Sequence, residues 1–144
     1  MSLLKIAHVP PPTVEPSATV LDAIRLMERE RVGAVAVVER GQLKGIFTER
    51  DVTLRVALRE LKPSATRVGE VMTSPPETAA DDMSEEEALT HMVAQHVRHL
   101  PIVAKDGRLL GMLSIRNVLE HQVDILSREL HSIGEYLAND GPGG

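Results

Sequence analysis

The feature that most constrains how this sequence can fold is an internal repeat. Segment 19–38, TVLDAIRLMERERVGAVAVV, shares its pattern with segment 84–103, SEEEALTHMVAQHVRHLPIV, 65 positions later (19 to 84). After one extra residue in a turn, GIFTERD at 45–51 matches GMLSIRN at 111–117, now 66 positions later (45 to 111). Surface turns tolerate such insertions easily. The chain therefore contains two copies of one structural unit.

Each copy has the pattern of a helix, two strands and a second helix. In the first copy, apolar side chains recur at the i, i+3, i+4 and i+7 spacing of a helix. They are Val20, Ala23, Ile24 and Met27. Thr19 is the expected N-cap of this helix. The Val-rich segment 33–38 and the segment 43–47 flank a turn, which predicts two buried strands in a hairpin. A second helix is expected to begin at Thr48.

The second copy predicts the same elements in the same order. Its first helix is expected after Ser84, its strands at 99–104 and 109–113, and its second helix from Ser114. One unit alone would form a marginal core, because chains below roughly 60 residues bury too little apolar surface. Two units stacked by a pseudo-two-fold axis would bury each other's sheets.

These patterns predict an α+β fold with a small three-stranded sheet and two helices in each repeat. An extended segment precedes each unit, PPTVEP at 11–16 or SPPETA at 74–79. The predicted division is a first repeat at 1–65, a second repeat with a C-terminal helix at 66–140, and a disordered tail at 141–144.

Composition and charge narrow the possible functions. The chain has 16 basic and 21 acidic residues and a net charge of −5, which argues against a nucleic-acid partner. No apolar run approaches the ~20 residues of a membrane span, and the N-terminus has no signal-peptide pattern. We therefore expect a cytoplasmic protein with no membrane partner. The absence of cysteine excludes disulfides and thiolate metal sites.

The sequence offers no recognisable catalytic set, so we predict that the protein is not an enzyme. It has no G-x-S-x-G, no H-E-x-x-H, no P-loop and no cysteine nucleophile. His91, His96 and His99 lie close together in the sequence. Helix positions i and i+5 point apart and His99 falls in or near a strand, so we expect no metal site there. His99 would either contact a phosphate beside Arg98 or be a half-buried strand residue.

Four short motifs, taken together with the repeat, give the chain a family likeness. They are VMTSPP at 71–76, HVRHLPIV at 96–103, and the paired GIFTERD and GMLSIRN. From about Leu4 to Ala138, the chain resembles a tandem pair of CBS domains, named after cystathionine beta-synthase, in the stand-alone form called a Bateman module. The resemblance implies a regulatory sensor that binds AMP, ADP or ATP, or sometimes NAD or S-adenosylmethionine, between its repeats. It also implies a flat homodimer and an effector protein that reads a conformational change.

The matching segments 48–51 and 114–117 suit such a ligand. A helix that begins at Thr48 leaves backbone N–H groups that attract phosphate. The Thr48 hydroxyl would donate to a phosphate oxygen, Arg50 would supply countercharge, and Asp51 would accept from the ribose diol. Thr48 and Asp51 also form a capping box, a purely structural role that is compatible with ligand binding.

The second repeat has Ser114, Arg116 and Asn117 at these positions. An amide has one acceptor oxygen, so Asn117 would hold a ribose diol only partly, and we expect it to be a poor capping-box partner. The adenine would lie against aliphatic side chains, because the sequence has one Phe, one Tyr and no Trp. The candidates are Val32, Ile46, Val97 and Met112.

The resemblance further implies that each site is shared between the repeats. Site one would comprise Ile46, Thr48, Arg50, Asp51, Met72, Thr73, Val97, Arg98 and His99. Site two would comprise Pro12, Thr13, Val32, Gly33, Met112, Ser114, Arg116 and Asn117. We expect site one to be tighter, because VRH at 97–99 adds donors where VGA at 32–34 adds none. The alternative function is a structural or interaction pair that has lost its ligand.

The C-terminal segment has an excess of apolar residues at helical spacing. They are Leu119, Val123, Leu126, Leu130, Ile133 and Leu137. This face could pack on the rest of the chain or on a second copy, and the sequence does not choose between them. We expect a homodimer.

Overall fold

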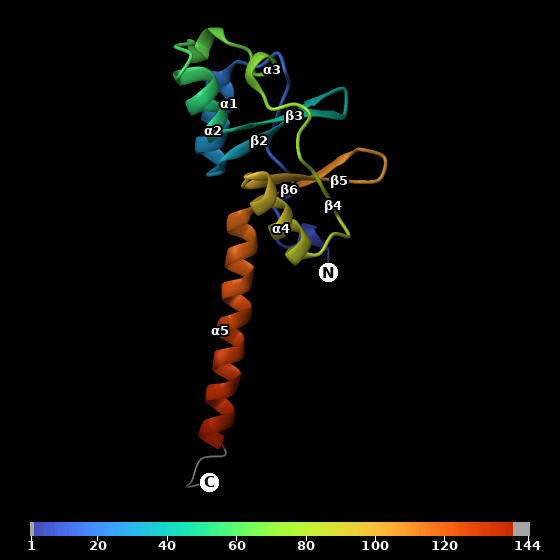
Figure 1. Ribbon diagram of the computed structural model, residues 1–144, viewed down its shortest axis with the longest axis vertical. Coiled ribbons are helices and arrows are strands. Elements are labelled where there is room, and N and C mark those ends of the chain that lie inside the picture. Colours follow the sequence, from blue (N-terminus) through green and yellow to red (C-terminus); the bar gives the residue numbers. More distant parts are fainter. Residues whose placement is uncertain (1, 140–144) are drawn as a thin grey trace.

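The computed structural model describes residues 2–139, and within this range it shows two small sheets with helices around them (Figure 1). The first sheet consists of β1 (Thr13–Val14), β2 (Ala34–Glu39) and β3 (Gln42–Thr48). The second consists of β4 (Ala79–Ala80), β5 (His99–Val103) and β6 (Leu109–Ser114). The helices are α1 (Val20–Glu30), α2 (Glu49–Asp51), α3 (Val68–Val71), α4 (Glu85–Gln95) and α5 (Ile115–Asn139). Shorter turns are η1 (Leu3–Lys5) and η3 (Pro63–Ala65), and a π-helix, η2 (Val52–Ala57), continues α2.

The two sheets have the same topology, which confirms the predicted α+β class and its duplication. In each sheet the short first strand runs parallel to the middle strand, and the last two strands form an antiparallel hairpin. A glycine with positive φ lies in each hairpin turn, Gly41 at +76° and Gly107 at +88°. These glycines are equivalent in the two repeats, and this backbone conformation suits glycine better than any residue with a Cβ. The predicted tail at 141–144 lies outside the described residues.

The first helix of each repeat begins and ends in the same way. The Thr19 hydroxyl accepts from the backbone N–H of Asp22 at 3.1 Å, and the Ser84 hydroxyl accepts from that of Glu87 at 3.0 Å. These are the N-caps that the sequence predicts. Each helix then ends at a residue in the left-handed conformation, Arg31 after α1 and His96 after α4. His96 therefore lies at a helix end and not on a helical face.

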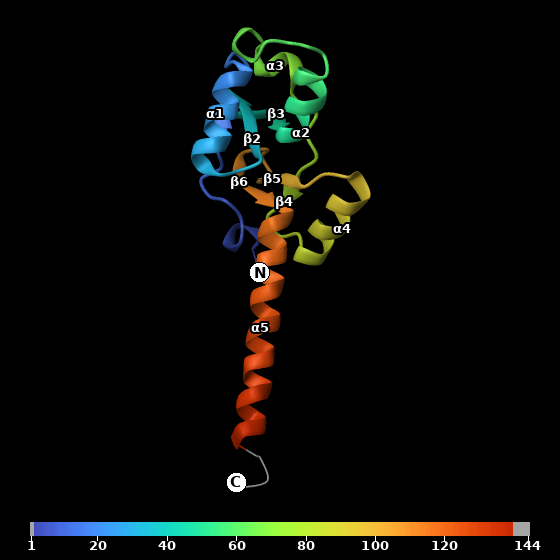
Figure 2. The same ribbon diagram turned by 90° about the vertical axis from the view of Figure 1, so that its left-hand side faces the viewer.

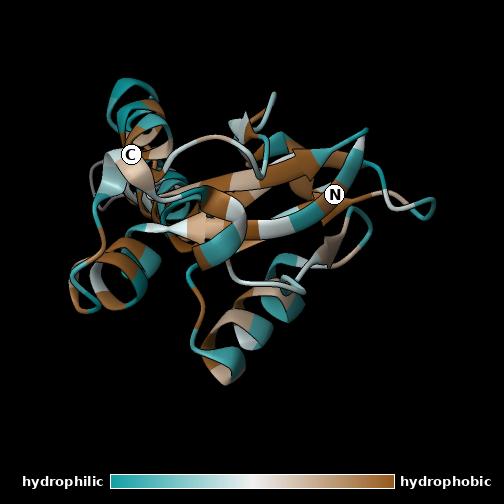
Figure 3. Cartoon of the chain, turned by 90° about the horizontal axis from the view of Figure 1, so that it is seen from above, coloured by the Kyte–Doolittle hydropathy of each residue, from teal (hydrophilic) through white to brown (hydrophobic). Residues whose placement is uncertain are grey.

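Three apolar clusters form the interior. The first repeat is centred on Phe47 with Val20, Met27, Val35 and Val37, and the second on Leu100 with Met92, Ile102 and Leu113. A third cluster lies between the sheets and draws on both repeats. Its buried members are Ala34, Ala36, Ile46 and Met112. The strands are accordingly apolar along much of their length and the hairpin turns are polar (Figure 3).

The segment before each repeat packs on the opposite repeat. Leu3 is fully buried in the second cluster, and His8 exchanges backbone hydrogen bonds with Met112 at 2.9 and 3.1 Å. Conversely, α3 belongs to the first cluster, and Thr73 exchanges backbone hydrogen bonds with Ile46 at 2.9 and 3.0 Å. The two repeats are thus tied together by both crossing segments. The division at 65/66 stays a prediction.

The helix α5 leaves the body of the molecule and runs away from it (Figures 1 and 2). Its base is fixed on α4, where His121 pairs with Glu85 and the Gln122 amide donates to Glu85 at 2.7 Å. The six apolar residues predicted at helical spacing stay exposed, so they do not pack on the rest of this chain. They are Leu119, Val123, Leu126, Leu130, Ile133 and Leu137. Within residues 2–139, no helix combines the length and the apolarity that a membrane crossing requires.

Candidate functional site

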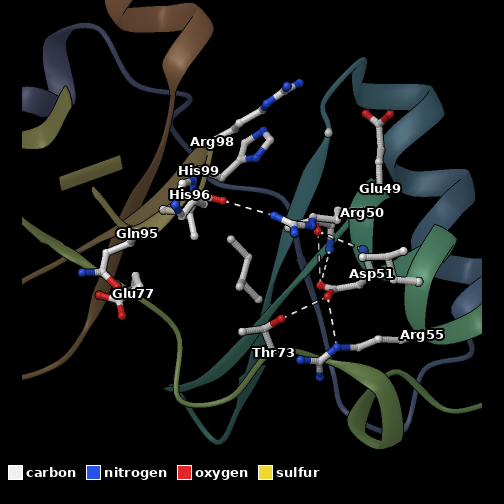
Figure 4. A pocket seen from close by; sticks show the side chains of 15 residues that line it. Glu49, Arg50, Asp51, Arg55, Thr73, Glu77, Gln95, His96, Arg98 and His99 are labelled. Atoms are coloured by element: carbon white, nitrogen blue, oxygen red, sulfur yellow. Dashed lines mark hydrogen bonds and ion pairs between the residues drawn. The ribbon is translucent and has the colours of Figure 1, made fainter. Parts of the chain in front are cut away.

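A cavity of about 700 Å³ lies between the repeats, at the end of β3 and the start of β5 (Figure 4). Every residue predicted for site one lines it except Met72. Met72 instead lies against Gly45, where an added Cβ would come within 2.8 Å of its sulfur. The structure therefore gathers both repeats' motif residues around one space, and their binding role stays a prediction.

Asp51 is the most heavily engaged side chain of this cavity. It is 7% exposed. Its Oδ2 accepts from the backbone N–H of Thr48 at 3.0 Å and from the Thr48 hydroxyl at 3.2 Å. Its Oδ1 accepts from the Thr73 hydroxyl at 3.0 Å and lies 3.5 Å from Arg55 Nε. A ribose diol would have to replace the Thr73 or Arg55 contact, because both carboxylate oxygens already have partners.

The start of α2 has fewer open donors than the sequence suggests. The Glu49 N–H donates to the Gly33 carbonyl at 3.0 Å, and the Asp51 N–H donates to the Thr48 hydroxyl at 3.2 Å. The expectation that backbone groups here would be available for phosphate is therefore wrong for these two. Attraction for an anion must come mainly from side chains.

Three arginines surround this cavity, and each has a different position. Arg50 donates from Nη1 to the His96 carbonyl at 3.3 Å and so links the first repeat to the second. Arg55 donates from Nη1 to the Met72 carbonyl at 2.9 Å while it faces Asp51. Arg98 comes from the second repeat. Figure 4 shows Arg50 and Arg98 on the side of the cavity away from Thr73.

His99 lies between the two repeats and is neutral at pH 7. Burial, together with the smaller effect of the neighbouring Arg98 charge, lowers its pKa from 6.5 to about 4. The imidazole is thus a hydrogen-bonding group and not a second positive charge. Glu77, which also lines the cavity, is paired with His91 at 2.9 Å. Within residues 2–139, no group of three or more His, Asp or Glu is placed to hold a metal ion.

A second cavity, of about 1040 Å³, lies by the start of α5. All predicted site-two residues line it except Pro12 and Thr13. Those two belong to the sheet edge, where Thr13 pairs with Ala36 and the Pro12 carbonyl accepts from the Ala36 N–H at 2.9 Å. The extended segment predicted at 11–16 thus provides the third strand of the predicted sheet, and its Pro12 and Thr13 lie outside the lining of this cavity.

Asn117 completes a capping box at the start of α5. The Ser114 N–H donates to Asn117 Oδ1 at 2.9 Å, and the Asn117 N–H donates to the Ser114 hydroxyl at 3.0 Å. The expectation that Asn would be a poor partner here is wrong, because the box needs only one acceptor oxygen. Asp51 contacts Thr73 and Arg55 through its second carboxylate oxygen. An amide has no second acceptor oxygen, so Asn117 cannot make equivalent contacts.

The two cavities share a wall. Gly33, Glu49, Arg98 and His99 line both. The wall is tightly packed: a Cβ on Gly33 would lie 2.7 Å from Glu49 Oε1 and 3.2 Å from His99 Cε1. Only glycine fits here without displacing one of these side chains.

Several residues that line the first cavity were not predicted from the sequence. They are Gly33, Glu49, Leu54, Arg55, Glu77, Gln95 and His96. Arg55 lies four positions after Asp51, a spacing at which helical side chains meet, so this ion pair could have been predicted. Glu49 and Leu54 belong to the same helical segment as the motif, whereas Glu77, Gln95 and His96 are brought in by the packing of one repeat on the other, which has no local signal.

Comparison with known proteins identifies the fold. The model of the CBS domain family matches residues 5–58 and 68–124. The chain is 36% identical over 127 residues to the CBS domain-containing protein YhcV of Bacillus subtilis, which covers 88% of this chain and 86% of that protein. The chain therefore belongs to the CBS domain family and carries two copies of the domain.

Solved structures of similar proteins agree with this assignment. A CBS-domain protein from Burkholderia ambifaria superimposes with a TM-score of 0.79 at 32% identity, over 86% of this chain and 95% of that one. A CBS domain protein from Pyrobaculum aerophilum, solved in complex with AMP, gives a TM-score of 0.74 at 26% identity, over 81% and 89% of the two chains.

Proposed function

We propose that this protein is a regulatory module that binds an adenine nucleotide between its repeats and transmits binding as a change of conformation. The observation that supports this most is the gathering of the Thr48–Asp51 motif and the 97–99 segment around one inter-repeat cavity. That a related protein was solved with AMP supports the ligand class. The preferred ligand is AMP, ADP or ATP, with NAD and S-adenosylmethionine as related candidates.

In the first cavity, each part of a nucleotide has a matching surface. Ile46 and Val97 offer the aliphatic contact for adenine, one from each repeat. Asp51 accepts from the ribose hydroxyls in place of a present donor. Arg50 and Arg98 face the phosphates. The Thr48 hydroxyl joins them only by giving up its hydrogen bond to Asp51 Oδ2. Because these groups come from both repeats, an occupied cavity clamps the repeats together, and a ligand shifts conformation by its preference for that clamped state.

The second cavity is the weaker site in this proposal. Its motif has Asn117 for Asp51, which removes one acceptor for the ribose. Its walls carry four acidic side chains against three arginines, so they offer no net positive charge to a polyphosphate. They are Glu28, Glu30, Glu49 and Glu120, and Arg31, Arg98 and Arg116. We further propose that the protein forms a homodimer, acts on an effector protein in the cytoplasm, and carries out no catalysis of its own. The competing function is a structural pair that binds no nucleotide.

Thermal unfolding of the purified protein with each of the five ligands tests this function. A ligand present at about 100 times its Kd stabilises the folded state by about 2.7 kcal/mol. We expect a clear rise of Tm with at least one adenine nucleotide and none with a guanine nucleotide at the same concentration. No rise with any of them would favour the structural function, and conversion of the ligand, followed by chromatography, would show an enzyme.

A further inference from the structure

The exposed aliphatic residues of α5 follow a heptad pattern. Their successive positions are spaced by 4, 3, 4, 3 and 4 residues. They are Leu119, Val123, Leu126, Leu130, Ile133 and Leu137. Written as a heptad, Val123, Leu130 and Leu137 occupy position a, and the other three occupy position d. A repeat of 3.5 residues keeps one narrow stripe in line only when two helices wind around each other. We call these six residues the seam.

The seam has no partner within the described chain. Its residues are exposed over 51% to 69% of their surfaces, and every residue from Leu126 to Ala138 is exposed. Helices in proteins gain most of their stability from packing of the apolar face. The distal part of α5 therefore lacks the contact that normally stabilises such a helix. The family match ends at residue 124, so the shared fold does not account for this part.

The opposite face of α5 is polar and has its own ion pairs. Asp124 pairs with Arg128 at 3.1 Å, and His131 lies 3.0 Å from Glu135. All four lie at heptad positions b and f, away from the seam. The helix is thus divided into an apolar stripe and a solvated back, which is typical of one strand of a coiled coil.

Charges beside the seam favour a second copy in parallel orientation. In a parallel pair, position g of one helix faces position e of the next heptad of the other. Glu129 at g would then face Gly134, and Gln122 would face Ser127. In a fully overlapping antiparallel pair, g faces g, and Glu129 would meet its own copy at the centre. The parallel pair avoids this like-charge contact.

We propose that α5 of one copy pairs with α5 of a second copy through the seam as a parallel two-stranded coiled coil. This deepens the homodimer proposed above. The two bodies then lie at the same end of the coiled coil. A second copy fits because the pairing is isologous, each seam residue meeting its equivalent, and no other helix within the described residues presents a matching heptad.

Cysteine cross-linking tests the pairing, because the natural chain has no cysteine. Leu130→Cys places a thiol at position a, where equivalent residues of a parallel pair come within disulfide range. Arg128→Cys, on the solvated back of the same helix, is the matched control. Mild oxidation of the full chain is expected to give a covalent dimer with Leu130→Cys and essentially none with Arg128→Cys.

Sedimentation of the full chain at micromolar concentration completes the test. We expect a dimer for the natural chain and for Arg128→Glu, and a monomer for Leu126→Glu/Leu130→Glu. The seam residues are exposed, so the double variant should keep the Tm of the body at low concentration. If the double variant is still a dimer, the coiled-coil proposal is wrong, but the homodimer proposal stands. A monomeric natural chain would overturn both, while the nucleotide-induced Tm shift still reports separately on ligand binding. A dimer without the Leu130→Cys cross-link would overturn the parallel orientation.

Discussion

Asp51 and Asn117 occupy equivalent positions in the two repeats but make different numbers of stabilising contacts. Both complete a capping box, and only Asp51 also accepts from the Thr73 hydroxyl and faces Arg55. The first repeat therefore has a buried polar cluster that joins two segments distant in sequence. The second has only the local cap.

The reciprocal exchange of these two residues is an informative experiment. Asp51→Asn removes the ion pair and one acceptor, so we expect a loss of about 1–3 kcal/mol in the free energy of unfolding. It should also remove most of the nucleotide-induced Tm shift. Asn117→Asp keeps its cap and should change both quantities much less. Urea unfolding and thermal shifts of the two variants measure this, and equal losses of the nucleotide response would contradict the ranking of the sites.

His99 makes the stability of the protein depend on pH. Its pKa is lowered to about 4 in the folded state from 6.5, so between these values the unfolded chain binds more protons. The contribution of His99 to the free energy of unfolding is therefore fully present above pH 6.5 and decreases as the pH drops towards 4. The total effect is on the order of 1–3 kcal/mol.

Urea unfolding from pH 7.5 to pH 4 measures this effect as a difference between variants. His99→Gln should flatten the curve over this range. The control is His131→Gln, on the exposed part of α5, which should follow the natural protein. A curve for His99→Gln that parallels the natural one would contradict the assigned cause.

At the scale of elements, two equivalent glycines explain how the crossing segments fit. A Cβ on Gly45 in β3 would lie 2.7 Å from the Thr73 carbonyl oxygen, and one on Gly111 in β6 would lie 2.9 Å from Leu4 Cδ2 and 3.4 Å from the His8 carbonyl oxygen. Each glycine thus lets the segment of the opposite repeat pass close over its strand.

Alanine at these positions should separate the two crossings. Gly45→Ala meets a backbone oxygen that cannot yield, so we expect a loss of about 1–3 kcal/mol. Gly111→Ala meets first the end of a flexible side chain and should cost less. Gly134→Ala, in open space on α5, should be neutral or stabilising by up to about 1 kcal/mol. Chemical denaturation ranks the three, and a Gly45→Ala variant as stable as Gly134→Ala would disprove the close crossing.

The elements were far more predictable from the sequence than their contacts. The caps at Thr19 and Ser84, the hairpin turn and the helical spacing are local signals, and all appear as predicted. Leu3 belongs to the second core, and Gln95 and His96 line the first cavity. These positions depend on how one repeat packs on the other. Pro12 and Thr13 were expected in the second site but do not line its cavity, since the extended segment at 11–16 was predicted without its register against the neighbouring strand.

For the whole molecule, the crossed segments predict a single unfolding transition. The core of the first repeat contains α3, which follows it in the chain, and the core of the second contains Leu3, which comes before the first repeat's own helix. Neither repeat has its complete core when the other is unfolded. Far-ultraviolet circular dichroism and the fluorescence of a dye attached at a cysteine introduced on the surface of the second repeat should therefore give the same midpoint in urea. Two separated midpoints would show that the repeats unfold independently.

The two cavities share a wall, so the protein would respond to a mixture of two ligands differently than to each ligand alone. The wall is formed by Gly33, Glu49, Arg98 and His99. A ligand that moves Glu49 or His99 when it enters one cavity changes the shape of the other cavity at the same time. By thermodynamic reciprocity, whatever factor the first occupant imposes on the affinity of the second is imposed in return. Titrations with a pair of nucleotides should then differ from the product of two separate isotherms, by the same factor whichever ligand is added first.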